Sequence, residues 1–485
     1  MSLYDKVTHW VCLPNEPANG QDGDDDDENN QSTFYVPPPS FAFETSWETY
    51  FASQGPPPFG VVMRTLFFPH LTGITPSTTI SQPHVDLSPP KRSTVNAHSI
   101  IERRPEFSFL AHGSYGATCV PALSALQHWN LLMESSPVGF FYDTLFPYIV
   151  RSIRSVSGYV NTEPRNLVLV TNVEVGMESV FRSLDLQAQD TILAFDMTYT
   201  AVLYSAQHAC DRSGAKLETI HMSSPITRRS GLEDLRMYLD KHDRENEGRR
   251  RDEKRRIRLA VFQHITSPTA ILLRVKQLID LCHQWGILVM IDGAHAIGQI
   301  PLNLSHLNAD FYVTNTHKWF CNPRVARFIW QGTADYSPYL ALYMSVKFWD
   351  WVGYEKVVER NHALATWCGR LLSRAWGTRL LVEDESMMGS MVTIELPPPP
   401  PSSISATKQD TLPITSVSSD TLRNQHGIEI PVFTFRGRQY VRVSLHMYND
   451  ERDCVRLGEA VLKGLGYSED THPGYALLKG GKSRL

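Results

Sequence analysis

The chain has 485 residues, of which 42% are apolar and 20% charged, and its formal net charge is −5 at pH 7. These values are ordinary for a globular protein, and the length predicts two folded parts with extensions. The slight negative charge gives no general attraction to nucleic acid or acidic membranes, and no apolar run approaches the length of a bilayer span.

Residues 1–104 differ in composition from the rest of the chain. They contain an acidic run at 22–28 and proline clusters at 37–39 and 56–58. Such stretches bury too little apolar surface to offset the entropy of ordering the chain, so this extension is predicted to be largely disordered or loosely packed. Its first residues also lack a basic start followed by an apolar stretch, which argues against a secretory signal.

Short apolar strands alternate with helical patterns between residues 105 and 340. The predicted strands are 167–170, 191–195, 258–262, 287–291 and 310–314, with helices at 174–184, up to 210, and at 274–285. This alternation predicts an α/β fold, with a mostly parallel sheet covered on both faces in one large domain. Ligands of such sheets bind beyond the carboxyl ends of the strands.

A smaller C-terminal domain is predicted over 341–470, followed by a tail at 471–485. It combines a long helix at 354–375, strands near 390–396 and 440–445, and a helix from 450. A proline- and serine-rich insertion at 397–419 interrupts it and reads as a surface loop. The basic stretch 249–258 could resemble a nucleic-acid patch, but its interspersed acidic residues favour a solvated helix end or loop.

Cysteine usage and the last three residues bear on compartment. The seven cysteines form no CxxC pair and no metal-binding spacing with histidine, which predicts free thiols in a reducing compartment and no metal site. We interpret Cys119 and Cys321 as inert thiols rather than catalytic ones. The chain ends in Ser483-Arg484-Leu485, a basic-residue variant of the peroxisomal signal, so the expected location is cytoplasmic or peroxisomal.

Two residues follow predicted strands in a way that suggests cofactor chemistry. Asp292 directly follows the strand 287–291, and Lys318 lies shortly after the strand 310–314. Taken singly, each has an ordinary interpretation as a helix cap or a solvated side chain. Pyridoxal phosphate (PLP) needs both a lysine for its Schiff base and a carboxylate that keeps its pyridine nitrogen protonated. The pair therefore predicts a PLP site.

Five motifs in order then carry a resemblance to a known family. They are the segments 109–116 (FLAHGSYG), 264–269 (HITSPT), those around Asp292 and Lys318, and 441–449 (VRVSLHMYN). Residues 105–470 resemble the class V aminotransferase-fold enzymes, especially the isopenicillin N epimerase-like branch with its L-cysteine desulfhydrases and hercynylcysteine sulfoxide lyases. The resemblance implies a PLP-dependent transferase fold of type I, with a seven-stranded, mostly parallel sheet and a smaller α+β domain. It also implies a homodimer with active sites at the subunit boundary.

The resemblance assigns roles to individual residues. Lys318 would form the Schiff base and move the proton of the substrate α-carbon, and Asp292 would pair with the pyridinium. His295 would contact the phenolate oxygen, and Tyr199 would stack on the ring unless it is simply a packed aromatic. The remaining cofactor contacts would come from Asn172, Val173, Glu174, Thr266, His317 and Thr333, and the substrate contacts from Arg442, His112 and Ser114.

Four positions depart from the pattern of the family. Ala111 stands where an asparagine is usual, and Glu174 stands where a threonine is usual. Asn315 and Gln263 replace a common serine and a common aspartate. A carboxylate beside a phosphate is unfavourable unless it turns away, so Glu174 is the departure with the clearest consequence. The lysine, the ring acid and the carboxylate-binding arginine are retained, so cofactor binding and catalysis are expected with a shifted substrate preference.

The leading functional prediction is a PLP-dependent carbon–sulfur lyase acting on cysteine or a cysteine S-conjugate. An amino-acid epimerase or an aminotransferase shares the first steps, and the sequence does not separate these outcomes. From another class, the chain could be a non-catalytic binding protein on the same fold. The expected partner is a small amino-acid substrate, with no nucleic acid and no membrane.

Overall fold

A computed structural model describes residues 11–13, 35–71, 87–90, 107–248, 250, 254–324, 334–400 and 417–482. Several predictions concern residues outside these ranges. They are the acidic run at 22–28, the phosphate contact Thr333, residues 249 and 251–253 of the basic stretch, residues 401–416 of the insertion, and the C-terminal tripeptide 483–485.

The larger domain is built around a parallel sheet. Its strands run in the spatial order β3-β2-β4-β5-β6, and all neighbouring pairs are parallel. Helices cover both faces, so β2 and β5 are buried along nearly their whole length, as apolar strands require. The predicted α/β architecture is confirmed. The strands are β2 (Asp190–Phe195), β3 (Lys216–Ile220), β4 (Arg256–Gln263), β5 (Leu288–Gly293) and β6 (Phe311–Thr314).

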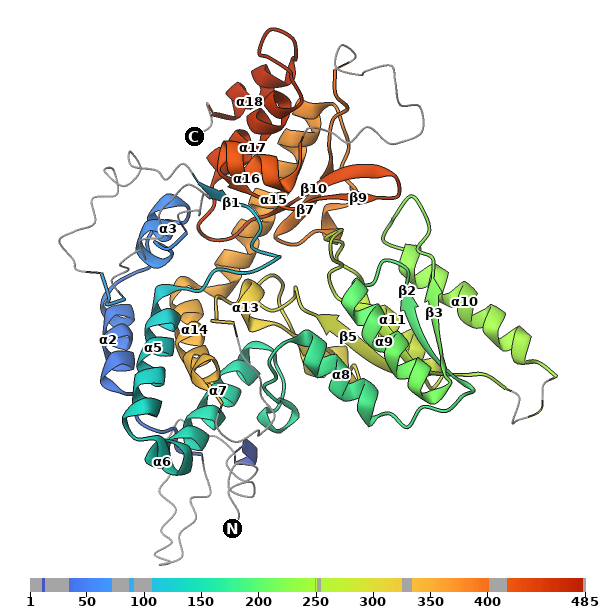
Figure 1. The fold of residues 1–485 in the computed structure, drawn as a ribbon, viewed down its shortest axis with the longest axis horizontal. Helices are drawn as coiled ribbons and strands as arrows, with labels where there is room; N and C mark the ends of the chain where they lie inside the picture. The colour runs from blue at the N-terminus through green and yellow to red at the C-terminus, as the bar shows by residue number, and fades with distance from the viewer. Residues whose placement is uncertain are drawn as a thin grey trace, which may run out of the picture.

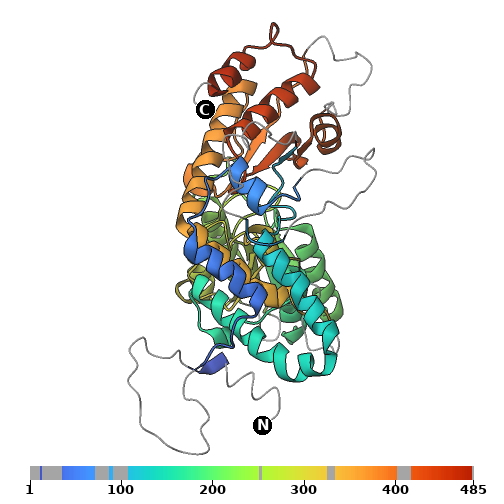
Figure 2. The same cartoon turned by 90° about the vertical axis from the view of Figure 1, so that its left-hand side faces the viewer.

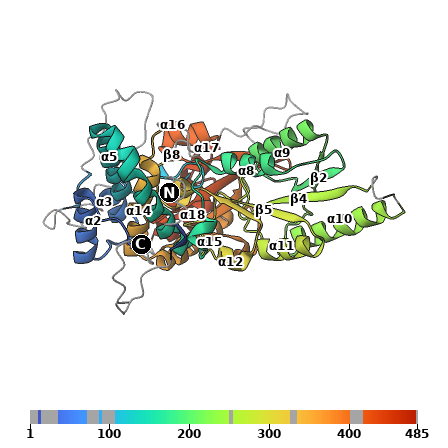
Figure 3. The same ribbon diagram turned by 90° about the horizontal axis from the view of Figure 1, so that it is seen from below.

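Four helices flank this sheet, namely α8 (Val173–Ser183), α9 (Thr200–Ser213), α10 (Ser230–Asn246) and α11 (Val275–Gln284). Successive residues of a strand point to opposite faces. Ile192 of β2 therefore packs with α8 and α9, whereas the next residue, Leu193, packs with α10 and α11. Figure 3 shows the two helix pairs on opposite sides of the sheet.

The sheet differs from the prediction in its number of strands. The described residues contain five parallel strands in this sheet, not seven. Residues 167–170 were expected to form a strand, but they have no regular secondary structure, and Val168 is 70% exposed. An apolar run is necessary for a buried strand but does not supply the neighbouring strand that its backbone must pair with.

A helical layer packs beyond β6. It comprises α5 (Val120–Ser135), α6 (Pro137–Gly139), a π-helical turn (Phe140–Thr144), α7 (Leu145–Tyr159), α14 (Ser337–Val352) and the first part of α15 (Tyr354–Trp376). The short helices α12 (Leu304–Leu307) and α13 (Thr316–Trp319) follow β5 and β6 respectively. Figure 1 shows α5, α7 and α14 side by side, with the sheet to their right.

The N-terminal extension contributes to this layer, so the prediction of loose packing is wrong for residues 35–71. Helix α2 (Ala42–Ser53) packs on α5 and α14, helix α3 (Val61–Phe67) places Phe67 against Phe348 of α14, and Trp47 is 1% exposed. Glu44 and Arg151 form a buried ion pair at 2.5 Å that ties α2 to α7. The aromatic residues between the proline clusters bury enough apolar surface to fold this segment, although the average composition of residues 1–104 is polar and proline-rich. Figure 2 shows α2 and α5 on one face of the molecule.

The smaller domain has an antiparallel sheet of order β7-β10-β9 and a parallel pair, β1 with β8. Its elements are β1 (Ser108–Phe109), β7 (Met391–Glu395), α16 (Ser419–His426), β8 (Ile428–Glu429), β9 (Val432–Phe435), β10 (Arg438–Ser444), α17 (Glu451–Gly464) and α18 (Gly474–Lys482). The predicted tail from 471 is therefore wrong for α18, which packs on α15 and α17 with Leu478 fully buried.

Two crossings join the domains. The long helix α15 begins in the core of the larger domain and ends in that of the smaller one. The segment 108–111 runs beside β8 and then touches β10, where Ala111 bridges Ser444. The predicted boundary at 340/341 therefore lies within α14, and the smaller domain also draws on residues near 108. Among the described residues, none of the helices has the length and apolar character needed to cross a bilayer.

Candidate active site

Lys318 lies at the carboxyl end of the parallel sheet, on the short helix α13 that follows β6. Burial lowers the pKa of its amine, the positive charge of Arg442 lowers it further, and the carboxylates of Asp292 and Glu174 oppose this. The amine nitrogen is 3.5 Å from Nε2 of His295. An amine in this environment reaches its nucleophilic, unprotonated form more readily than a solvated lysine does.

Asp292 is the penultimate residue of β5 and is 3% exposed. Its carboxylate accepts hydrogen bonds from the Ala294 amide at 2.9 Å and from the Gln263 side chain at 3.3 Å. Burial raises the pKa of this carboxyl despite those bonds. No ion pair among the described residues includes Asp292, so a cation bound beside it would stabilise its ionised form.

Arg442 reaches the same site from β10 of the smaller domain and is 3% exposed. It donates to the hydroxyls of Ser114 at 2.8 Å and Ser267 at 3.2 Å. Burial lowers its pKa to about 10, and its Nε has no hydrogen-bond partner within the described part of the chain. A carboxylate would satisfy this planar donor group in two places at once.

These groups form an arrangement that a single ligand could complete. A buried acid and a buried guanidinium, neither of them in an ion pair among the residues described, lie within electrostatic range of one lysine. Buried charges that lack a partner are costly, and such arrangements concentrate at functional sites. The missing partners are a cation for Asp292 and an anion for Arg442, and the pyridinium of PLP and the α-carboxylate of an amino acid carry those charges.

The start of α8 was predicted to hold the phosphate of the cofactor. The Asn172 side chain caps this helix by accepting from Val175 at 2.8 Å, and the Val173 amide donates to the Asn315 side chain at 3.2 Å. The second helical residue, Glu174, has no intrahelical acceptor for its amide, because its position precedes the first helical hydrogen bond. The site thus offers the Glu174 amide to an anion, with the carboxylate of the same residue nearby.

Two further predicted contacts lie near this region. Tyr199 is 41% exposed, and the carboxylates of Glu174 and Asp292 contribute to raising its pKa, after burial. This exposure excludes the alternative of a packed core aromatic and leaves the ring available for stacking. His317 precedes the lysine, and burial together with the charge of Lys318 lowers its pKa to about 4, so it is neutral.

Two of the predicted contacts are packed against or hydrogen-bonded to other residues of the protein. His112 was expected to bind substrate, and its ring is fully buried among Tyr448, His446 and Trp319. Thr266 was expected to contact the cofactor, but its hydroxyl is bonded to Thr269 at 2.6 Å and to the Ile271 amide at 2.9 Å. Both residues shape the segments that present their neighbours Ser114 and Ser267 to Arg442.

Sequence reasoning missed several residues that position the site. Ser267 lies in a recognised motif, yet only the structure shows it bonded to Arg442. Trp319 donates its indole N–H to Nδ1 of His295 at 3.2 Å. Gly116 packs directly against the backbone of the lysine segment. The motif around each of these residues was visible in the sequence, but the residue that each one contacts lies more than twenty positions away in the chain.

The close packing at Gly116 leads to a prediction. A Cβ atom at this position would lie 2.0 Å from the Lys318 carbonyl oxygen, so Gly116→Ala must displace the lysine segment. We expect a loss of about 1–3 kcal/mol in the free energy of unfolding together with weaker cofactor retention. Gly158→Ala is the control, because nothing lies within 4 Å of its added Cβ. Equal thermal stability of both variants and the wild type would contradict the packing argument.

Comparison with known proteins shows which family this part of the chain resembles. Residues 153–324, which carry Asp292, His295 and Lys318, match the model of the class V aminotransferases. This segment of the chain is therefore similar to the class V aminotransferases. The family match spans β2 to β6 and ends just after α13, so it covers the sheet and its carboxyl-end residues.

Curated relatives extend the similarity to most of the length of the chain. The putative L-cysteine desulfhydrase 1 of Oryza sativa subsp. japonica is 28% identical over 411 residues, which cover 73% of this chain and 82% of the relative. The isopenicillin N epimerase of Amycolatopsis lactamdurans is 24% identical, and the match covers 76% of this chain and 97% of the relative. The hercynylcysteine sulfoxide lyase of Schizosaccharomyces pombe is 22% identical, and the match covers 74% of this chain and 94% of the relative. The predicted branch is confirmed.

Solved structures share the fold of this chain. A C-DES mutant with glycine covalently linked to its PLP cofactor superposes with a TM-score of 0.60 at 16% identity, covering 75% of this chain and 97% of that one. The cystine C-S lyase C-DES in complex with cysteine persulfide gives a TM-score of 0.57 at 16% identity, covering 74% and 97%. At such identities the similarity concerns the fold alone.

Proposed function

We propose that this protein is a PLP-dependent carbon–sulfur lyase acting on cysteine or a cysteine S-conjugate. The observation that carries the proposal is a pair of buried groups, Asp292 and Arg442, which have no ion-pair partner among the described residues and whose charges both act on Lys318. The choice of a lyase within the family is supported by the L-cysteine desulfhydrases among the relatives, including that of Arabidopsis thaliana at 28% identity over 405 residues.

Each residue of the site would have a separate role in this reaction. Bound PLP supplies an electron sink for the pair of electrons left at the substrate α-carbon. Asp292 would hold the positive charge of the ring, and Arg442 would orient the α-carboxylate with help from Ser114 and Ser267. Lys318 would hold the cofactor covalently and, as a free amine, would take up the α-proton of the substrate. Burial favours this amine in its unprotonated form.

The overall reaction is balanced with water as the only co-reactant. Loss of the α-proton and of the β-sulfur group breaks one C–H and one C–S bond, and water then releases the nitrogen. Cysteine and water therefore give pyruvate, ammonia and hydrogen sulfide. With an S-conjugate, the corresponding thiol or sulfenate leaves in place of sulfide.

A substrate screen tests the proposal directly. The purified, PLP-loaded protein is incubated with cysteine and a panel of cysteine S-conjugates, and pyruvate and sulfur products are measured by mass spectrometry. We expect stoichiometric pyruvate and sulfur product from at least one substrate and none from alanine, which has no β-leaving group. Absence of both products from every conjugate would refute the lyase assignment.

Epimerase activity is the second candidate, because isopenicillin N epimerases are among the relatives. The same residues would remove the α-proton, and the outcome would differ only in where the proton returns. Exchange of the α-hydrogen in deuterated water without loss of sulfur would favour epimerisation. Formation of a keto acid together with pyridoxamine phosphate would favour transamination.

We also propose that the protein is a homodimer. Several large apolar side chains are exposed on the α5–α6 side of the molecule, among them Leu131, Val138 and Tyr142, each between 69% and 72% exposed. Tyr115, next to the substrate-site Ser114, is 69% exposed as well. Apolar surface of this kind marks contact sites. Analytical ultracentrifugation of the PLP-loaded protein should give twice the chain mass, and a monomer would contradict the proposal.

The departure at Glu174 gives a further prediction. Its carboxylate lies within electrostatic range of Lys318 and Asp292 at the start of α8, where the cofactor phosphate is expected. Glu174→Thr removes repulsion between the carboxylate and the phosphate, so PLP should bind about tenfold more tightly to the cofactor-free protein. Glu178→Thr, one turn further along the helix and paired with Arg182, is the matched control. Equal PLP dissociation constants for the two variants would contradict this reasoning.

A further inference from the structure

A group of buried rings lies behind the lysine. It runs from Tyr448 through His112, His446 and Trp319 to His295, and each of these residues is at most 2% exposed. His112 contacts the Tyr448 hydroxyl at 2.5 Å and stacks on His446 with ring centroids 4.0 Å apart. We call these five residues the ring relay.

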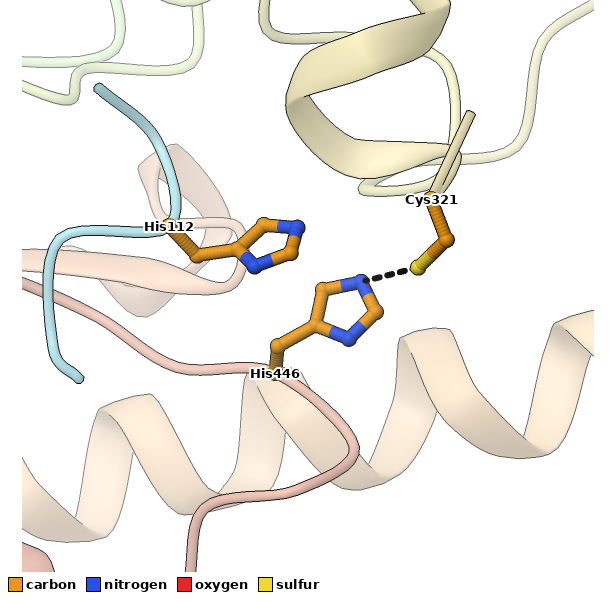
Figure 4. A group of neighbouring side chains, drawn as sticks. All are labelled: His112, Cys321 and His446. Carbon is orange, nitrogen blue, oxygen red and sulfur yellow. Dashed lines mark hydrogen bonds between the residues drawn. The ribbon is translucent and has the colours of Figure 1, made fainter. Parts of the chain in front are cut away.

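A metal site is the first possibility that the ring relay raises. Among the described residues, His112, Cys321 and His446 offer ligand atoms within 4.8 Å of one another (Figure 4). An imidazole nitrogen binds a metal in the plane of its own ring at about 2 Å. The two imidazole planes are stacked and tilted by only 25°, so no single ion can lie in both planes at bonding distance. The geometry therefore excludes shared ligation by the two histidines as they are placed here.

The hydrogen bonds of the ring relay have fixed directions instead. An indole N–H can only donate, so Nδ1 of His295 must accept from Trp319 with its lone pair at 3.2 Å. Burial, and after it the positive charges of Lys318 and Arg442, lower the pKa of His295 well below the usual range. A neutral imidazole with an accepting Nδ1 carries its only hydrogen on Nε2. That nitrogen is the one 3.5 Å from the Lys318 amine.

The indole itself is held rigidly. Nε2 of His446 is 3.2 Å from the Trp319 carbonyl oxygen, which can only accept, so His446 donates there. A Cβ atom at Gly298 would lie 2.4 Å from the same carbonyl oxygen, and one at Gly113 would lie 3.2 Å from the indole ring. Because backbone and ring are both enclosed, the indole N–H cannot turn away from His295.

We propose that Trp319 is a positioning residue that fixes His295 as its Nε2–H tautomer. His295 is then a permanent hydrogen-bond donor on the Lys318 side of the site and cannot accept the proton that Lys318 removes from the substrate. A donor at this place stabilises an anionic oxygen of the cofactor ring. This inference deepens the proposed function. Of its tests, only the measurement of visible absorbance depends on PLP binding.

The tautomer can be measured without cofactor. In protein labelled with ¹⁵N in the histidine rings, the signals of His295 are identified by their loss in His295→Gln. We expect the wild type to show a protonated Nε2 and an unprotonated Nδ1. The opposite tautomer would overturn the inference, and this measurement needs no variant of Trp319 to fold.

Two tryptophan variants test the cause. Trp319→Phe removes the indole N–H and keeps an aromatic ring, so both tautomers of His295 should become populated. The matched control is Trp349→Phe. Trp349 is equally buried, and its indole N–H donates at 3.0 Å to the carbonyl oxygen of Phe320, the residue after Trp319. This control should leave the His295 signals unchanged. A single Nε2–H tautomer retained in Trp319→Phe would overturn the inference.

The PLP-loaded protein provides an independent measurement. Loss of a fixed donor makes the anionic ring oxygen more basic, so the pH midpoint of the visible absorbance change should rise in Trp319→Phe. In a His295→Gln background the same change should cause no further rise, because a glutamine amide has no tautomers. Equal rises in both backgrounds would overturn the inference. A wild type without any visible band would instead refute the proposed PLP function and leave the tautomer result standing.

Discussion

Replacing Lys318 with alanine is expected to give a folded protein that retains no coloured cofactor and has lost at least about three orders of magnitude of activity. The amine is the nucleophile that would bind PLP and also the base that would remove the substrate proton. No second lysine among the described residues lies near Asp292: the only lysine charge that affects the pKa of Asp292 is that of Lys318. Loss of this side chain therefore removes both functions together.

Folding should survive this change. Burial lowers the pKa of the Lys318 amine, so the folded state holds the charged form at a cost, and alanine removes that cost. The measurements are the visible spectrum after dialysis against excess PLP, the rate of pyruvate formation, and the thermal midpoint. Lys347→Ala, on α14 beside the Tyr343 ring, is the control and should keep colour and rate. A coloured, active Lys318→Ala protein would overturn the active-site assignment.

Replacing Arg442 with methionine is expected to lower kcat/KM while leaving stability unchanged or increased. Loss of a buried, charge-assisted contact with a carboxylate costs about 2–5 kcal/mol, which corresponds to a fall of about thirty- to several-thousandfold. Among the described residues, however, the side-chain hydrogen bonds of the buried guanidinium go only to the hydroxyls of Ser114 and Ser267. Removing an incompletely paired buried charge lowers the cost of folding.

Arg360 supplies a matched comparison. It is partly buried, and its guanidinium donates to the carbonyl oxygens of His446, at 3.0 Å, and of Asn449. Arg360→Met leaves those carbonyls without their donor and should lower the free energy of unfolding. Opposite stability changes in the two variants, measured by denaturant unfolding, would distinguish a ligand-binding arginine from a structural one. An Arg442→Met protein that is destabilised and retains wild-type kcat/KM would contradict the assignment.

The pH dependence of Arg442 has a definite sign. Its folded pKa of about 10 lies below its ordinary value, so the unfolded chain binds more protons between the two values. The cost of burying the charge is therefore fully present below pH 10 and declines as the pH rises above it. A carboxylate ligand removes the same cost at neutral pH. Ligand binding should accordingly raise the thermal midpoint of the wild type more than that of Arg442→Met.

Much of the fold was predictable because strand and helix periods are local properties of the chain. The strands ending near Asp292 and before Lys318, the long helix α15 and the strand carrying Arg442 were all placed within a few residues. The errors arose where a segment needs a distant partner. Residues 167–170 have the composition of a strand but form no strand ladder, whereas α2 and α18 fold because α5, α14, α15 and α17 cover their apolar faces.

The sequence by itself determined which chemistry this protein could support. A lysine and an acid after neighbouring parallel strands imply PLP, because the carboxyl ends of such strands meet at one edge. Only the tertiary structure decided how those groups are controlled. It places Arg442 from the other domain beside Ser114 and Ser267, and it directs the Trp319 indole to His295. Hydrogen bonds and burial depend on atoms brought together by folding, so no local pattern in the chain could reveal them.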